Sequence, residues 1–283
     1  MQKTIALVNG APHSVNVCDY AAWAAQRLSA PLELLHVLDR HPERAPVTDY
    51  SGSIGLGAQE TLLDELTDLD EKRSTLAQHY GRELLGSLVQ RAKETGLERV
   101  ESRLRHGSLL EAVVDLEPES RLFVVGQTPA QAGAKAHLDP HIEQVIRALH
   151  RAVLVASTAY RQPRSFALAI DGSATSRKMV ETVAQSPLLR GLAGHLVMAG
   201  DASEASRKEF DWAQEHLRSA GFEISSSIKP GHPESVLPTY LKTHNVDLLV
   251  MGAYGHSRIR QFIVGSTTTT LLRTSPVPVL VLR

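Results

Sequence analysis

The sequence predicts an α/β protein with two tandem domains, each containing a five-stranded parallel sheet flanked by helices. Short apolar runs alternate with segments whose apolar residues recur at helical spacing, which is typical of a parallel sheet covered on both faces. The series restarts after a polar linker at residues 158–165. A shift of 126 residues aligns Leu122 and Gly126 with Leu248 and Gly252, so the two halves form a repeat. We therefore place the domains at residues 1–157 and 163–283.

The first half is expected to contain a long insertion at residues 41–71 in addition to its sheet and helices. The insertion is expected to be partly helical from residue 58, because leucines at 62, 63, 66 and 69 recur at helical spacing, and its acidic residues indicate a solvated face. A separate amphipathic helix is expected from Leu76 to Ala92. The strands are expected at residues 4–8, 32–38, 100–104, 122–125 and 152–156, and the other helices at 17–28, 108–115 and 142–149.

The second half repeats this order with shorter connections. Its helix at residues 233–244 contains Pro238, which predicts a kink. The last strand is apolar and carries Pro278, which is typical of an edge strand open to pairing. The strands are expected at residues 166–170, 195–199, 223–228, 248–251 and 277–282, and the helices at 177–185, 208–220, 233–244 and after residue 265.

Composition narrows the class of protein. The chain has 283 residues with 30 basic and 31 acidic side chains, and this balance argues against a dedicated nucleic-acid binder. Cys18 is the only cysteine and excludes an intrachain disulfide; its neighbours indicate a small apolar residue on a helix. The sequence has no apolar stretch of about 20 residues, so we expect no membrane span and a cytoplasmic location.

The stretch from residue 247 to residue 270 contains the strongest functional signal. A buried strand ends at Gly252, Gly255 follows, and after nine more residues come Gly265 and Ser266 at the start of a threonine-rich helix. Glycines allow positive φ and close approach of the backbone to a ligand. The first N–H groups of a helix have no intrahelical partner and attract phosphate. The pattern therefore indicates an anion site between a strand and a helix.

This spacing, Gly-x-x-Gly-x(9)-Gly-Ser/Thr, resembles the nucleotide-binding motif of the universal stress protein family. The resemblance extends over essentially the whole chain and implies two flavodoxin-like (Rossmann-like) domains, with ATP, accompanied by Mg²⁺, bound in the second one. In the second half, the resemblance implies that an acidic residue after the first strand contacts the adenosine part of the nucleotide. It also implies that the backbone at the end of the second strand contacts the adenine ring. The residues that it implicates are Asp171, Gly172, Ala199, Met251, Gly252, Gly255, His256, Arg258, Gly265, Ser266, Thr267 and Thr268.

Asp171 leaves two interpretations open. A carboxylate accepts hydrogen bonds from a ribose hydroxyl or an adenine amino group, but an acid at this position can equally cap the helix that follows. The glycine motif favours the first interpretation. No catalytic residue and no metal ligands are expected, because the loop offers no clear general base and no protein-made metal site.

The first half departs from the motif. The 126-residue shift places Pro129 opposite Gly255 and the sequence Asp139-Pro140-His141 opposite Gly265-Ser266-Thr267. A carboxylate then stands where a phosphate would lie, and proline removes an N–H donor. Asn9 replaces the acid at position 171. We therefore expect that the first half does not bind ATP in the manner of the family.

Other interpretations compete with nucleotide binding. His137 and His141 have the spacing of metal ligands on a helix, but Pro140 interrupts it. The glycines at 52, 55 and 57 resemble a phosphate loop without its lysine. The same fold could also be an adenine-nucleotide hydrolase or transferase, or an interaction scaffold with a vestigial site. Members of the family pair through their last strands, so residues 152–156 and 277–282 are expected to pair within the chain, and a homodimer is a further possibility.

Overall fold

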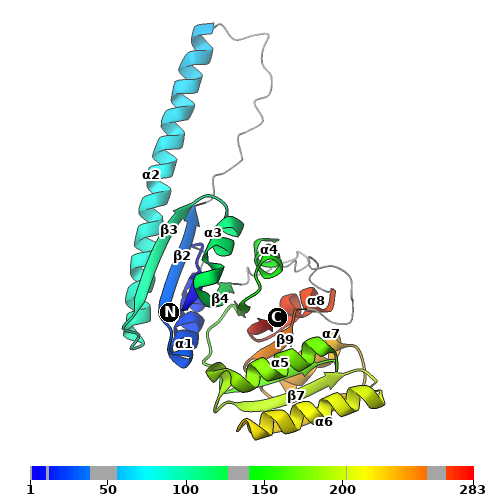
Figure 1. The fold of residues 1–283 in the computed structure, drawn as a ribbon. Helices are drawn as coiled ribbons and strands as arrows, with labels where there is room; N and C mark the ends of the chain where they lie inside the picture. Colours follow the sequence, from blue (N-terminus) through cyan, green and yellow to red (C-terminus); the bar gives the residue numbers. More distant parts are fainter. Residues whose placement is uncertain (1, 11–12, 39–55, 127–139, 202, 254–265) are drawn as a thin grey trace.

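A computed structural model describes residues 2–10, 13–38, 56–126, 140–201, 203–253 and 266–283, with the arrangement shown in Figure 1. Five parallel strands make up the sheet of each half. In the first half they are β1 (Lys3–Leu7), β2 (Leu32–Leu38), β3 (Val100–His106), β4 (Ser120–Gly126) and β5 (Ala152–Ala156). In the second half they are β6 (Ser165–Ile170), β7 (Ala193–Ala199), β8 (Ile224–Lys229), β9 (Leu249–Gly252) and β10 (Val279–Leu282).

All ten strands form one sheet in the order β3-β2-β1-β4-β5-β10-β9-β6-β7-β8. The halves meet where β5 pairs with β10, which is the antiparallel pair of the sheet, and Leu154 lies opposite Leu280 there. Both leucines are buried. The unpaired apolar edge that the sequence indicates for the last strand is therefore covered by the other half.

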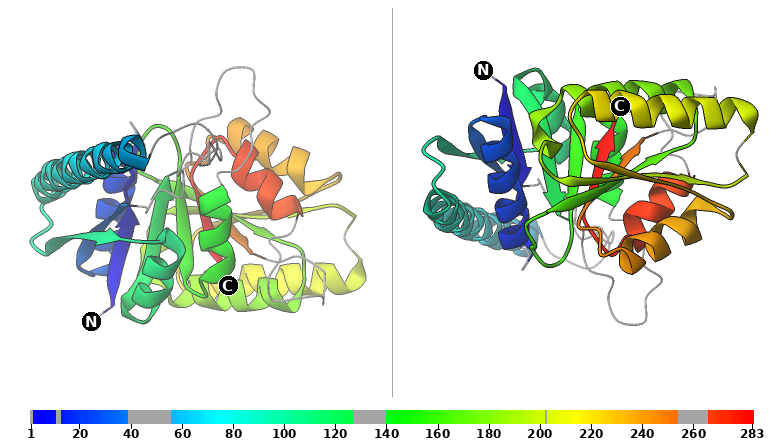
Figure 2. Two further views of the ribbon diagram at one scale, coloured as in Figure 1. Left: turned by 90° about the horizontal axis from the view of Figure 1, so that it is seen from above. Right: turned by 90° about the horizontal axis from the view of Figure 1, so that it is seen from below.

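Helices cover both faces of the sheet, as the alternating sequence predicts. One face packs against α1 (Ser14–Leu28), α2 (Leu56–Glu94), α5 (Ala174–Gln185) and α6 (Glu204–Ser219), and the other against α3 (Leu109–Leu116), α4 (Pro140–Ala148), α7 (Pro233–Thr243) and α8 (Ser266–Thr274). Figure 2 shows these two layers from opposite sides. Each layer buries a continuous apolar cluster against its face of the sheet.

The structure corrects one expectation about the insertion. The helical segment from residue 58 and the helix at 76–92 are a single α-helix of 39 residues, α2. The residues between them, Lys72 to Thr75, include no glycine or proline, so nothing in the sequence interrupts the helix. The rest of the insertion, residues 39–55, lies outside the described residues.

The linker between the halves is held by hydrogen bonds to both. The Asn16 side chain in α1 donates to the Thr158 carbonyl at 2.5 Å and accepts from the Tyr160 N–H at 3.1 Å. Asp247 is buried before β9 and accepts from the backbone N–H groups of Arg164 and Ser165. These bonds satisfy polar groups where β6 begins and fix the second half relative to the first.

Cys18 is fully buried in α1, where its thiol donates to the Leu88 carbonyl. Burial raises the pKa of Cys18 to about 12. The thiol is therefore protonated and unreactive at neutral pH, which confirms that Cys18 acts as a small apolar residue on a helix.

Candidate functional site

The two halves each contain a point where strand order reverses, and ligands bind outside the carboxyl ends of the strands at such points. In the second half this point lies between β6 and β9, which are hydrogen-bonded neighbours. Asp171 follows β6, Gly252 ends β9 and Ala199 ends β7. The fold therefore brings the ends of the strands that carry the predicted site residues to one edge of the sheet.

Asp171 makes the hydrogen bonds of a turn into α5. Its Oδ1 atom accepts from the Ser173 N–H at 3.0 Å and from the Ser176 hydroxyl at 2.5 Å. Ser173 in turn caps α5 by accepting from the Ser176 N–H. Ser173, and not Asp171, is therefore the N-cap of α5, and the bonds to Asp171 hold its carboxylate in the turn before the helix.

Gly172 has a backbone conformation that a side chain would strain. Its φ is +74°, and a Cβ there would lie 3.1 Å from the Cα of Ser206. Glycine is therefore required for the tight turn after β6 and for its contact with α6.

The β9 side of the site leads from the sheet toward α8. Met251 is buried in β9, where it lies beside Ala169 of β6 and Val281 of β10. It therefore supports the strand from within the core. The Thr268 hydroxyl donates to the Ala253 carbonyl at 3.2 Å, which ties α8 to the end of β9.

Ser266 begins α8 and is exposed. The first N–H groups of a helix have no intrahelical acceptor. Thr267 follows and is half-buried. Four predicted residues, Gly255, His256, Arg258 and Gly265, lie outside the described residues. The structure thus gives the two ends of the predicted anion loop, the strand end at Gly252 and the helix start at Ser266.

Glu234 is a residue of this region that sequence reasoning missed. It lies in the first turn of α7, and its Oε1 accepts from the Thr267 hydroxyl at 2.5 Å. This hydrogen bond is the main reason that the pKa of Glu234 lies below its ordinary value. The available signal was an acid just after Pro233, a position typical of the first turn of a helix. It predicted a helix start but no contact with Thr267.

Two glycines that follow β7 and β8 were also missed. Gly200 has a φ of +107° and Gly231 a φ of +114°. A Cβ on Gly200 would lie 3.9 Å from the Gly231 carbonyl oxygen, so the two turns approach each other beside Ala199. The turns after β7 and β8 therefore both use the left-handed backbone region that favours glycine.

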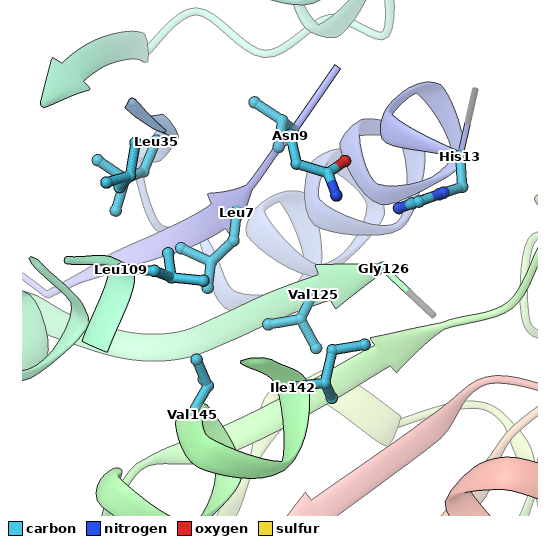
Figure 3. Close-up of a pocket in the computed structure, with 11 residues that line it drawn as sticks. Leu7, Asn9, His13, Leu35, Leu109, Val125, Gly126, Ile142 and Val145 are labelled. Atoms are coloured by element: carbon cyan, nitrogen blue, oxygen red, sulfur yellow. The ribbon is translucent and has the colours of Figure 1, made fainter. Parts of the chain in front are cut away.

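The first half has a cavity of about 220 Å³ at its own reversal point between β1 and β4 (Figure 3). Aliphatic side chains from β1, β2, β4, α3 and α4 surround it, and Asn9 and His13 add polar groups. His13 packs over Gly126, where a Cβ would lie 2.4 Å from its Cδ2 atom. The lining residues are Leu7, Val8, Asn9, His13, Leu35, Val37, Leu109, Val125, Gly126, Ile142 and Val145.

The described lining of this cavity includes no lysine or arginine that would neutralise a phosphate. Asn9 occupies the position of Asp171, and its Oδ1 accepts from the Ser14 hydroxyl at 3.4 Å. Pro129, His137 and Asp139 lie outside the described residues. The two reversal points therefore differ in chemistry as well as in sequence.

The hydrogen bond between Glu234 and Thr267 gives a prediction about pH. The folded-state pKa of Glu234 is lowered, so its stabilising contribution is present above the unfolded pKa and is lost as the pH falls through the folded pKa. We expect Glu234→Gln to lower the free energy of unfolding at pH 7 by at most about 1 kcal/mol. The difference between wild type and variant should shrink as the pH falls below the lowered folded-state pKa of Glu234. Urea unfolding across this pH range measures it.

Thr267→Val provides the control for that experiment. In a Thr267→Val background the carboxylate has lost its hydroxyl donor, so Glu234→Gln should have much less effect at every pH. A difference that is the same at pH 7 and at low pH, or that persists without the Thr267 hydroxyl, would contradict the role of this bond.

The fold and the two strand-end sites define a class: a tandem α/β protein with flavodoxin-like halves joined in one sheet. Within the described residues, no helix is long and apolar enough to cross a membrane. A model of the universal stress protein family matches residues 1–157 and 193–283. The chain therefore belongs to the universal stress protein family.

Individual relatives agree with this assignment. The chain is 31% identical over 287 residues to universal stress protein Slr1230 of Synechocystis sp., and the match covers all of both chains. It is 25% identical over 81 residues to universal stress protein MJ0577 of Methanocaldococcus jannaschii, covering 29% of this chain and 50% of that one. The crystal structure of a universal stress protein from Archaeoglobus fulgidus has a TM-score of 0.71 and 17% identity, over 99% of this chain and 98% of that chain.

Proposed function

We propose that this universal stress protein binds ATP, or a related adenine nucleotide with Mg²⁺, in its second half. The observation that carries the proposal is the sheet edge where Gly252 ends β9 and Ser266 begins α8, the two described ends of the glycine motif. The N–H groups at the start of α8 would face the phosphates. Gly255, His256, Arg258 and Gly265 would complete the loop, and the turns at Gly172 and Ala199 would face the nucleoside.

The first half is proposed not to bind ATP. Its cavity has an aliphatic lining, His13 covers Gly126, and the sequence places Asp139 and Pro140 where the second half has Gly265 and Ser266. A carboxylate repels phosphate, and proline has no N–H to donate. The pairing of β5 with β10 is proposed to keep this half attached as a structural partner of the nucleotide-binding half.

We propose that the protein acts as a nucleotide-dependent regulatory or protective module and does not turn ATP over efficiently. The competing function is phosphoryl transfer, and the observation that favours it is the carboxylate of Glu234 on the hydroxyl of Thr267. A base beside a hydroxyl is an arrangement that activates a nucleophile. However, the lowered pKa of Glu234 makes it a weak base at neutral pH, which favours binding over transfer.

Turnover distinguishes these functions. The full-length protein is incubated with Mg-ATP and the nucleotides are separated by anion-exchange chromatography, while intact-protein mass spectrometry detects any phosphoryl adduct. The binding proposal predicts that bound ATP remains intact over many minutes and that the protein mass does not change. The binding proposal would be wrong if the amount of ADP increased steadily during the incubation. It would also be wrong if wild type gained a phosphoryl group that Thr267→Val did not gain. Either result would indicate an enzymatic function.

A further inference from the structure

The helix α2 extends far beyond the sheet that it packs against (Figure 1). From Gly81 onward it packs on the first half, with Leu85, Leu88 and Ala92 buried at helical spacing. A two-bond ion pair from Arg91 to Asp19 of α1, at 2.7 and 2.8 Å, fixes this part of the helix. Residues 56–79 precede it, and we call them the arm. The arm is about 36 Å long at the helical rise per residue.

The middle of the arm, residues 67–76, makes no packing contacts that bury it, and Ala77 and Gln78 are partly buried. Every residue from 67 to 76 is exposed, including Leu69 at 61% and Leu76 at 69%. An isolated helix of this length is marginal in water, because most helical stability in proteins comes from packing one apolar face. The exposed leucines of the arm would therefore be stabilised by packing against a second apolar surface.

The sequence of the arm has the repeat of a coiled coil. Leucines stand seven residues apart at 62, 69 and 76, and Leu66 falls at an intermediate position, four residues after Leu62 and three before Leu69. Tyr80, the next residue of this spacing, lies beyond the arm, where its hydroxyl donates to the Gly10 carbonyl of the first half at 3.0 Å. Residues at this spacing line one stripe of a helix and pack into the facing helix of a partner. Arg73 occupies one position of the stripe, and a single polar residue there favours one register over others.

The charges of the arm identify the partner. Residues 60–71 contain six acidic side chains and no lysine or arginine, whereas residues 72–82 contain Lys72, Arg73 and Arg82 and no acid. A second copy in antiparallel orientation sets the acidic stretch of each arm against the basic stretch of the other. A parallel pair would instead align like charges along its whole length, which is destabilising.

We propose that the arm is a dimerisation element that forms an antiparallel coiled coil with the arm of a second copy of this chain. The register centres on Glu71, so that Asp70 of each copy lies level with Lys72 of the other. The two sheets then lie toward opposite ends of the coil. This surface is separate from the strand-end sites of both halves.

Size-exclusion chromatography with light scattering on the full-length protein tests the proposal. Wild type is expected to have twice the mass of the 30.8 kDa chain at micromolar concentration. The double substitution Leu69→Asp and Leu76→Asp should give a monomer and reduce helical circular dichroism, because the unpaired arm frays. Both side chains are exposed, so the sheets should keep their melting temperature. Val114→Asp, at an exposed aliphatic side chain on α3, is the matched control and should stay dimeric.

Charge reversal tests the orientation. Asp68→Lys with Asp70→Lys leaves Glu71 as the only acid between residues 66 and 82, so position 70 of each copy then repels Lys72 of the other. Lys72→Glu with Arg73→Glu leaves only acidic charges from residue 60 to residue 73. Each variant alone should be monomeric, and an equal mixture should restore the dimer. A monomeric wild type, which would arise if residues 39–55 covered the leucines, would overturn the proposal. So would a Leu69→Asp, Leu76→Asp variant that remains dimeric, or a mixture that fails to dimerise.

Discussion

Gly265→Asp is expected to weaken ATP binding by at least about 100-fold, which corresponds to about 2.7 kcal/mol. The substitution places a carboxylate immediately before Ser266, where the N–H groups that begin α8 would face the phosphates. The new charge repels the ligand and competes for the same donors. It also reproduces in the second half the aspartate that the repeat places at position 139 of the first half. Isothermal titration of the full-length protein with Mg-ATP measures the loss.

Gly86→Asp is the matched control for this change. Gly86 lies on α2, and a Cβ there meets nothing within 4 Å, so the same substitution adds the same charge without a contact. Its affinity for ATP should equal that of wild type. Unchanged binding in Gly265→Asp would contradict a phosphate site at the start of α8 and would favour an interaction scaffold with a vestigial loop.

Leu154→Ala and Leu280→Ala are each expected to lower the free energy of unfolding by about 2–5 kcal/mol. The two side chains are buried opposite one another where β5 and β10 join the halves. Each substitution removes apolar contacts that cross the junction and leaves a cavity at the truncated side chain. The double variant should lose less than the sum of the single effects, because the two residues share one contact. Urea unfolding of the four proteins gives the coupling energy, expected to be about 0.5 kcal/mol or more.

Leu116→Ala provides the comparison for this cycle. Leu116 is buried against the opposite face of the sheet, in a different apolar cluster from Leu154. Leu116→Ala should also lower the free energy of unfolding. Its effect and that of Leu154→Ala should be additive in the double variant, with no coupling energy. Additive losses for Leu154 and Leu280 would show that the halves do not depend on one another through β5 and β10. The proposed role of the first half as a structural partner would then fail.

Much of the fold could be predicted from the sequence, because the apolar spacing within each segment agrees with the alternating order of strands and helices along the chain. Strands such as β2 and β5 are short apolar runs between turn residues, and both match the expected ranges. The uninterrupted α2 was missed because no apolar residue stands between Leu69 and Leu76, where Arg73 takes the position that the helical spacing would make apolar. Of the glycines at 52, 55 and 57, which resembled a phosphate loop, Gly57 lies in the first turn of α2, and the other two lie outside the described residues. Local chemistry thus predicted the elements better than it predicted their lengths.

The candidate site was less accessible to sequence reasoning. Gly252, Ser266 and Asp171 could be named in advance, because a glycine, a cap and an acid at strand ends have a local meaning. Glu234 and Thr267 lie on different helices and are 33 positions apart in the sequence. No local sequence pattern could predict that they would be in contact. The bonds from Ser173 and Ser176 to Asp171 likewise show that a residue chosen for ligand contact also holds its own turn.

The nucleotide content of the purified full-length protein tests the central claim most directly. The protein is denatured, and the supernatant is separated by anion-exchange chromatography and quantified against the chain concentration. The account predicts an adenine nucleotide at a level that approaches one per chain, and its loss in Gly265→Asp. Two nucleotides per chain would contradict the difference between the halves. A protein that is empty and also fails to bind added Mg-ATP would contradict the nucleotide site itself.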